Sequence, residues 1–89
     1  MTVRLKVNQA ELSLLGRAIE LARAGGGIPA LARILAAAFV AQATELELSD
    51  EDAARLQVAC ILLGAQGEKK AAKLERRLLA SRTAARLAE

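Results

Sequence analysis

The chain has 89 residues, of which 54% are hydrophobic, and its single aromatic residue is Phe39. Its 13 basic and 10 acidic residues give a net charge of +3, which permits nucleic-acid binding without demanding it. The absence of histidine and the single cysteine, Cys60, exclude an internal disulfide and leave no acid–base pair suited to catalysis near neutral pH. We therefore expect a small helical protein that is not an enzyme and holds no metal ion or cofactor.

The first segment, Thr2–Val7, alternates aliphatic and polar residues, which is typical of a half-buried strand. Asn8 follows the strand and can cap a helix, with Glu11 completing a capping box. We expect this helix to span about Gln9–Ala24. Gly16 in its middle weakens the helix by about 1 kcal/mol relative to alanine, and a glycine there allows close approach of a neighbouring element.

Gly25–Gly27 predicts the end of the first helix, because glycine adopts the left-handed C-cap conformation without steric penalty. A second helix should begin at Pro29 and continue to about Ala43. It is apolar on nearly every side, which predicts burial all round. A small monomer cannot easily cover such a helix, so we predict a homodimer or larger assembly with Leu35 and Phe39 at or near its centre. Phe39 also fits the core of a single chain.

The second half of the chain repeats this order. A strand pattern recurs at Glu45–Leu48, and Ser49 can cap a helix that reaches about Gly64. A last helix should run from Glu68 to about Leu87. The predicted fold is therefore a single, mainly α domain (residues 1–89) with two strand–helix–helix repeats, residues 1–43 and 44–89, and a short antiparallel two-stranded ribbon.

Positive charge is concentrated at the end of the chain. Residues 65–89 contain seven basic and three acidic residues, whereas residues 1–64 contain six basic and seven acidic residues. The last helix would carry a possible basic patch made of Lys69, Lys70, Lys73, Arg76 and Arg77. Such a patch is typical of a solvated helix face and, alternatively, of a nucleic-acid contact.

The order of strand, helix, glycine turn and helix in the first half resembles the ribbon-helix-helix family of DNA-binding regulators. The resemblance implies that two strands pair as an antiparallel ribbon whose outward side chains enter the major groove. It assigns those side chains to Thr2, Arg4 and Lys6. It also implies that backbone N–H groups near the start of the second helix meet a phosphate, which assigns this role to Gly26, Gly27 and Ile28.

Two pairings of the ribbon stay open. If Thr2–Val7 pairs with its own copy from a second subunit, the basic side chains are doubled on one surface. If it pairs with Glu45–Leu48 of the same chain, Arg4 lies opposite Glu47 and Lys6 opposite Glu45. Cross-strand pairs of opposite charge stabilise a ribbon, whereas like charges destabilise it, so charge favours pairing within the chain.

The leading interpretation is a small DNA-binding transcription regulator of the ribbon-helix-helix type. The alternative is a protein-interaction module, such as an antitoxin-like or inhibitory protein, without DNA binding. Double-stranded DNA and another protein are thus the two candidate partners. The longest apolar run, Ile28–Ala43, is shorter than the roughly 20 residues that a membrane span needs. Because the single cysteine can form no internal disulfide, the sequence fits a reducing compartment, and we expect a cytoplasmic protein.

Overall fold

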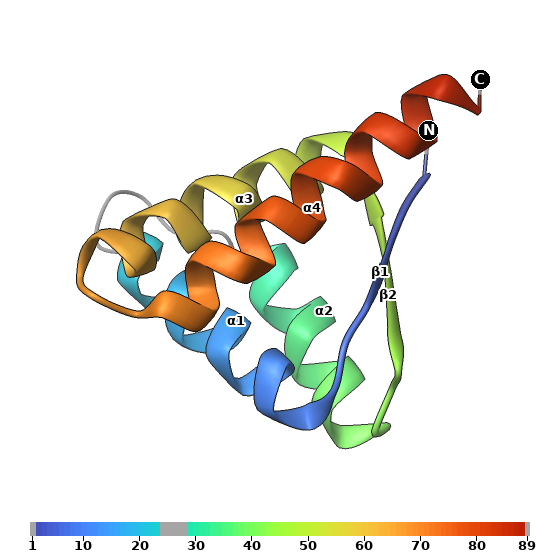
Figure 1. Ribbon diagram of the computed structural model, residues 1–89. Coiled ribbons are helices and arrows are strands. Elements are labelled where there is room, and N and C mark those ends of the chain that lie inside the picture. The colour runs from blue at the N-terminus through green and yellow to red at the C-terminus, as the bar shows by residue number, and fades with distance from the viewer. Residues whose placement is uncertain (1, 24–28, 89) are drawn as a thin grey trace.

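The computed structural model describes residues 2–23 and 29–88 (Figure 1). It is mainly helical with a two-stranded antiparallel sheet, as the sequence predicted. The elements follow in the order β1 (Thr2–Lys6), α1 (Gln9–Arg23), α2 (Pro29–Val40), β2 (Glu45–Ser49), α3 (Asp50–Ala65) and α4 (Lys69–Leu87). The predicted turn at Gly25–Gly27 lies outside the described residues.

The two strands pair within one chain, in the register that opposite charges favour. The pairs are Thr2 with Ser49, Val3 with Leu48, Arg4 with Glu47, Leu5 with Leu46 and Lys6 with Glu45. Both strands alternate exposed and buried residues along their length. The aliphatic side chains therefore lie on one face against the core, and the charged side chains lie on the solvated face.

Each strand leads directly into a helix through a side-chain cap. The backbone N–H of Glu11 donates to Asn8 Oδ1 at 2.8 Å, and the N–H of Asn8 donates to Glu11 Oε1 at 3.0 Å. The N–H of Asp52 donates to Ser49 Oγ at 3.1 Å. Both predicted caps are confirmed, and they satisfy helix donors that would otherwise have no partner.

The core forms where α1, α3 and α4 meet under the sheet. α1 packs against both α2 and α3, and α4 packs along α3 and across β1 (Figure 1). Leu15, Leu56 and Leu78, one from each core helix, are fully enclosed. The two halves of the chain thus pack unequally, because α4 lies on the sheet whereas α2 packs mainly on α1.

The second helix, α2, is buried on one side only, whereas the sequence predicted burial on all sides. Leu31 and Leu35 are buried against α1, but Ala36 and Ala37 are exposed and Val40 is 83% exposed. The reason is that a single neighbouring helix covers only one side of α2. The structure therefore leaves an apolar helix face in contact with solvent.

α2 and α3 end in the same way. At the end of α2 the N–H of Ala43 donates to Ala38 O at 2.9 Å, and Gln42 has a φ of 54°. At the end of α3 the N–H of Glu68 likewise donates to Leu63 O at 3.4 Å, and Gly67 has a φ of 101°. These are Schellman-type ends, which require a left-handed residue. α2 accordingly stops at Val40, earlier than the predicted Ala43.

A chain of polar side chains joins α3 to α4. Arg82 Nε donates to Asp50 Oδ1 at 3.0 Å, and Arg82 Nη1 donates to Gln57 Oε1 at 2.8 Å. Gln57 Nε2 in turn donates to Glu75 Oε1 at 2.9 Å. The hydrogen bond from Arg82, with the charges of Arg82 and Arg86, lowers the pKa of the Asp50 carboxyl below its usual 3.8.

Gln42→Gly should raise the free energy of unfolding by about 1 kcal/mol, because a residue with a Cβ is strained in the left-handed region. Gly67→Ala should lower it by a similar amount, since it places a Cβ at the equivalent position of the other end. Urea denaturation of both variants measures the two changes. A loss of stability in Gln42→Gly would show that the Gln42 side chain, and not its backbone, stabilises this end.

Asp50→Asn should destabilise the protein at neutral pH. A carboxyl whose pKa is lowered on folding contributes stability above its unfolded pKa, and the contribution is lost as pH falls through the folded pKa. The difference in unfolding free energy between the variant and the wild type should therefore shrink as the pH falls below 3.8. Denaturation at several pH values tests this, and a difference independent of pH would contradict it.

Candidate functional site

The outer face of the sheet places basic and acidic side chains side by side. Arg4 Nε lies 3.5 Å from Glu47 Oε1, and both side chains are more than half exposed. Lys6 is paired in register with Glu45, and Thr2 is exposed at the end of the same strand. Opposite charges thus alternate on this face, which reduces its attraction for phosphates. The other residues predicted to contact DNA, Gly26, Gly27 and Ile28, lie outside the described residues.

Arg77, predicted as part of a basic patch, ties α4 to the first two elements. Its guanidinium forms an ion pair with Glu11, the capping residue of α1. It also donates a hydrogen bond to the backbone carbonyl of Lys6, at the end of β1. The positive charge of Arg77 is therefore partly neutralised by Glu11 within the chain.

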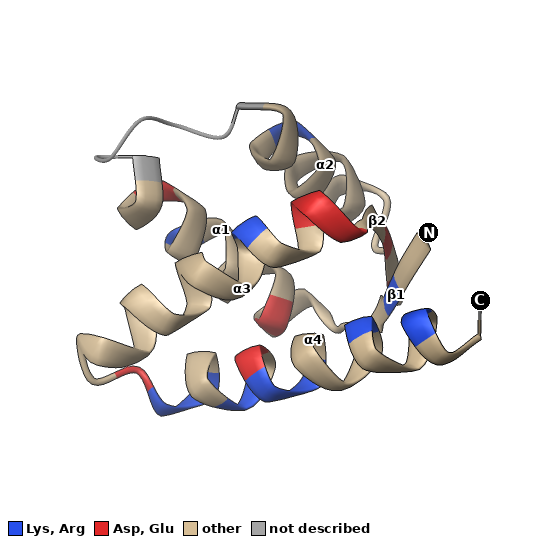
Figure 2. Ribbon diagram, turned by 90° about the horizontal axis from the view of Figure 1, so that it is seen from above, with Lys and Arg blue, Asp and Glu red and all other residues tan. Residues whose placement is uncertain are grey.

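The other four residues of the predicted patch, which we call the basic stripe, lie in the first half of α4, where the ribbon is mostly blue (Figure 2). Lys69, Lys70, Lys73 and Arg76 are all exposed, and none makes an ion pair with any residue that the structure describes. Lys70 and Lys73 border a groove of about 460 Å³ between the start of α1 and the start of α4. Glu68 lies on the same edge, where it forms an ion pair with Arg17, and Glu11 lines the groove with its partner Arg77, so Lys70 and Lys73 supply the positive charge of this edge that is not paired with a described residue.

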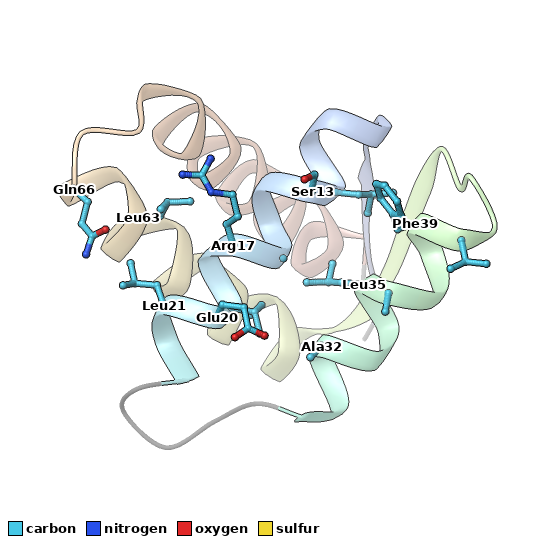
Figure 3. Close-up of a pocket in the computed structure, with 14 residues that line it drawn as sticks. Ser13, Arg17, Glu20, Leu21, Ala32, Leu35, Phe39, Leu63 and Gln66 are labelled. Atoms are coloured by element: carbon cyan, nitrogen blue, oxygen red, sulfur yellow. The ribbon is translucent and has the colours of Figure 1, made fainter.

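A larger and mainly apolar groove, which we call the α1 groove, lies over the outer side of α1 (Figure 3). It has a volume of about 840 Å³. α2 forms one wall and the last turn of α3 forms the other. The lining comes from Leu12, Ser13, Gly16, Arg17, Ile19, Glu20 and Leu21 of α1, Ala32, Leu35, Ala36, Phe39 and Val40 of α2, and Leu63 and Gln66. Its shape and composition resemble those of a site that takes an apolar partner.

Gly16 lies in the floor of the α1 groove. Among the described residues, no atom of another element lies within 4 Å of the position that a Cβ at Gly16 would occupy. A glycine in mid-helix costs about 1 kcal/mol relative to alanine. The close approach that this glycine permits is thus not used within the described parts of the chain.

The two residues predicted at a subunit contact have different surroundings. Leu35 is 3% exposed and belongs to the core, whereas Phe39 is 47% exposed in the wall of the α1 groove. Gln9 Nε2 donates to the Phe39 carbonyl at 3.2 Å and so fixes the end of α2 on the start of α1. Phe39 therefore leaves about half of its surface exposed at an anchored helix end.

Cys60 is a core residue without nucleophilic character. It is 1% exposed, and burial, with a smaller contribution from Glu75, raises the pKa of its thiol to about 12. Within residues 2–23 and 29–88, no three acidic or cysteine side chains gather to bind a metal ion. In the same part of the chain, every helix is too short or too polar to cross a membrane.

The double charge reversal Glu45→Lys with Glu47→Lys should lower the free energy of unfolding by about 1–2 kcal/mol, because each cross-strand pair contributes about 0.2–1 kcal/mol and becomes repulsive. Adding Arg4→Glu and Lys6→Glu should restore most of this stability, since the pairs are then complementary again. Chemical denaturation measures both changes. Unchanged stability in the double variant would contradict the ion pairing on this face.

Comparisons of this chain with protein-family models, with curated proteins and with solved structures found no match.

Proposed function

We propose that this protein is a protein-interaction module that binds an amphipathic helix of a partner protein in the α1 groove. The observation that carries the proposal is Gly16. It is a destabilising residue in the middle of a helix, it lies in the floor of an apolar groove, and no described residue fills the space above it. Glycine at this position allows the backbone of a partner helix to approach closely, and no described element of the chain itself makes such an approach.

The dimensions and walls of the groove suit a helix. The residues of α1 that line the groove span ten positions, from Leu12 to Leu21, and are therefore about 15 Å long, which matches roughly three turns of a partner helix. Phe39 and Val40 expose apolar surface along one wall, and Leu63 lies in the other. An amphipathic helix binds such a groove by inserting apolar side chains at spacings of three and four residues.

The charge beside the groove defines the chemistry of the partner. Ser13 and Arg17 line both the α1 groove and the smaller groove between α1 and α4. The two grooves are therefore neighbours, separated by Ser13 and by Arg17, which lies 3.7 Å (Nη1 to Oε2) from Glu68, and Lys70 and Lys73 lie at the far edge of the second. A partner helix with acidic residues on the edge toward α4 is complementary to both parts.

A DNA-binding transcription regulator of the ribbon-helix-helix type is the second candidate, acting as an internally duplicated chain in the cytoplasm. It is supported by the order of strand, helix and helix in each half and by the unpaired basic stripe on α4 among the described residues. The ribbon itself argues for the first candidate, because Glu45 and Glu47 oppose its basic side chains. Titration with duplex DNA at several salt concentrations separates the two, since phosphate contacts weaken steeply as salt rises.

Gly16→Ala should raise the free energy of unfolding by about 0.5–1 kcal/mol, since alanine is the better helix former and its Cβ meets open space. Gly16→Leu should leave the protein folded while it fills the floor of the groove. Thermal or urea denaturation and circular dichroism test both statements. A large loss of stability in Gly16→Ala would show that Gly16 has a structural role within the chain.

Binding is tested with a displayed library of amphipathic helical peptides of about 15 residues, long enough to span α1. Peptides are selected on the wild-type protein and counter-selected on Gly16→Leu, with Gly16→Ala as the matched control that should still bind. We expect enriched peptides with a small residue in the centre of the apolar face and acidic residues on one edge. Lys70→Glu with Lys73→Glu should weaken them. Peptides that bind Gly16→Leu equally well, or an enrichment of basic edges, would overturn the proposal.

A further inference from the structure

α3 has an exposed apolar face in addition to the face that it buries in the core. Ala53, Leu56, Ala59, Cys60 and Leu63 point inward. On the solvent side, however, Val58 is 56%, Ile61 51% and Leu62 44% exposed, and Ala54 and Ala65 flank them. The helix is therefore apolar on two sides, and one of them is uncovered.

This apolar surface extends onto α4. Gly64 and Ala72 lie at the contact between the two helices, where the Ala72 backbone is 3.7 Å from the position of a Cβ at Gly64. Ile61 is one helical turn before Gly64, and Leu79 is two turns after Ala72 on the same side of its helix, so both border this contact. Leu79 is 48% exposed. We call the surface made by Ala54, Val58, Ile61, Leu62, Ala65 and Leu79 the α3–α4 face.

The order of side chains on α3 is self-complementary. Ala54, Val58, Ile61 and Ala65 are spaced by four, three and four residues, which is the spacing of a helix–helix contact. Their sizes run small, large, large, small. When two such helices pack antiparallel, Ala54 of one lies near Ala65 of the other and Val58 lies near Ile61, as a two-fold axis requires.

Charges at the two ends of the stripe select the same orientation. Glu51 precedes Ala54 by three residues and is exposed, although it also pairs with Arg55 on its own helix. Lys69 begins α4 directly after the turn that follows Ala65, and it makes no ion pair with a described residue. An antiparallel pair brings Glu51 of each copy toward Lys69 of the other, whereas a parallel pair places like charges together.

We infer that a second copy of this chain covers the α3–α4 face, in a two-fold antiparallel homodimer. The face is about 18 Å long, from the 12 residues between Ala54 and Ala65, and about 20 Å wide, from two helices packed side by side. Its footprint is thus on the order of 400 Å² per copy, compared with about 800 Å² for a standard interface. An interface of this size is typical of a transient dimer. It shares no residue with the lining of the α1 groove, so it does not depend on the proposed function.

The first test measures sedimentation equilibrium of the full chain from micromolar to millimolar concentration. Ile61→Glu should raise the dimer dissociation constant by at least about tenfold, because it places a charge in the centre of the interface. Val40→Glu is the matched control, since Val40 is also an exposed aliphatic residue but lies on α2. Circular dichroism verifies the fold of both variants. A monomer at all concentrations, or a dimer that Val40→Glu dissociates and Ile61→Glu does not, would overturn the inference.

The second test is a charge-swap cycle. Glu51→Lys and Lys69→Glu should each raise the dissociation constant by about threefold or more, because each creates two repulsive contacts in the symmetric dimer. The double variant carries both changes in both copies and should return close to the wild-type value. Weakening that simply adds in the double variant would contradict the antiparallel arrangement.

Discussion

The pairing of β1 with β2 is the constraint on which the other elements depend. Side chains alternate with a period of two along a strand, so a slip of β2 by one residue would move Leu46 and Leu48 into solvent and turn Glu45 and Glu47 inward. The caps that start α1 and α3 follow the strands directly. The register therefore also fixes where these two helices begin. Arg77 then holds α4 against this frame through the Lys6 carbonyl and Glu11.

The local features could be predicted because their causes lie within a few residues. Alternation predicted both strands, Asn8 and Ser49 predicted both helix starts, and the opposed charges predicted pairing of the strands within the chain. The position of Arg77 could not be predicted, since its partners are 66 and 71 residues away and any basic residue on α4 fits the sequence pattern equally well. The unequal packing of α2 and α4 has the same origin. It depends on which of the two helices packs on the sheet, and the apolar periodicity of α2 and α4 does not predict this.

The candidate binding surfaces were visible in the sequence only as single unusual residues. Gly16 and Phe39 are conspicuous in their helices, but that they line one groove follows from the packing of α2 on α1. The outer face of α3 has no such marker in the sequence. Its helix is apolar on two sides, so periodicity alone cannot tell the buried side, with Leu56, from the exposed side, with Val58 and Ile61. A chain rich in alanine and leucine therefore specifies its helices more clearly than its surfaces.

The contact between β1 and α4 has a consequence for how the chain folds. The first strand is covered by the last helix, and the two are linked by a hydrogen bond across 71 residues. Contacts this distant in sequence form late, because a long loop must close before they contribute. During synthesis β1 emerges before α4 and stays without this cover until α4 is available. In that interval the apolar side chains of β1, Val3 and Leu5, lack the cover of α4, and apolar surface that is exposed in this way promotes association between incompletely folded chains.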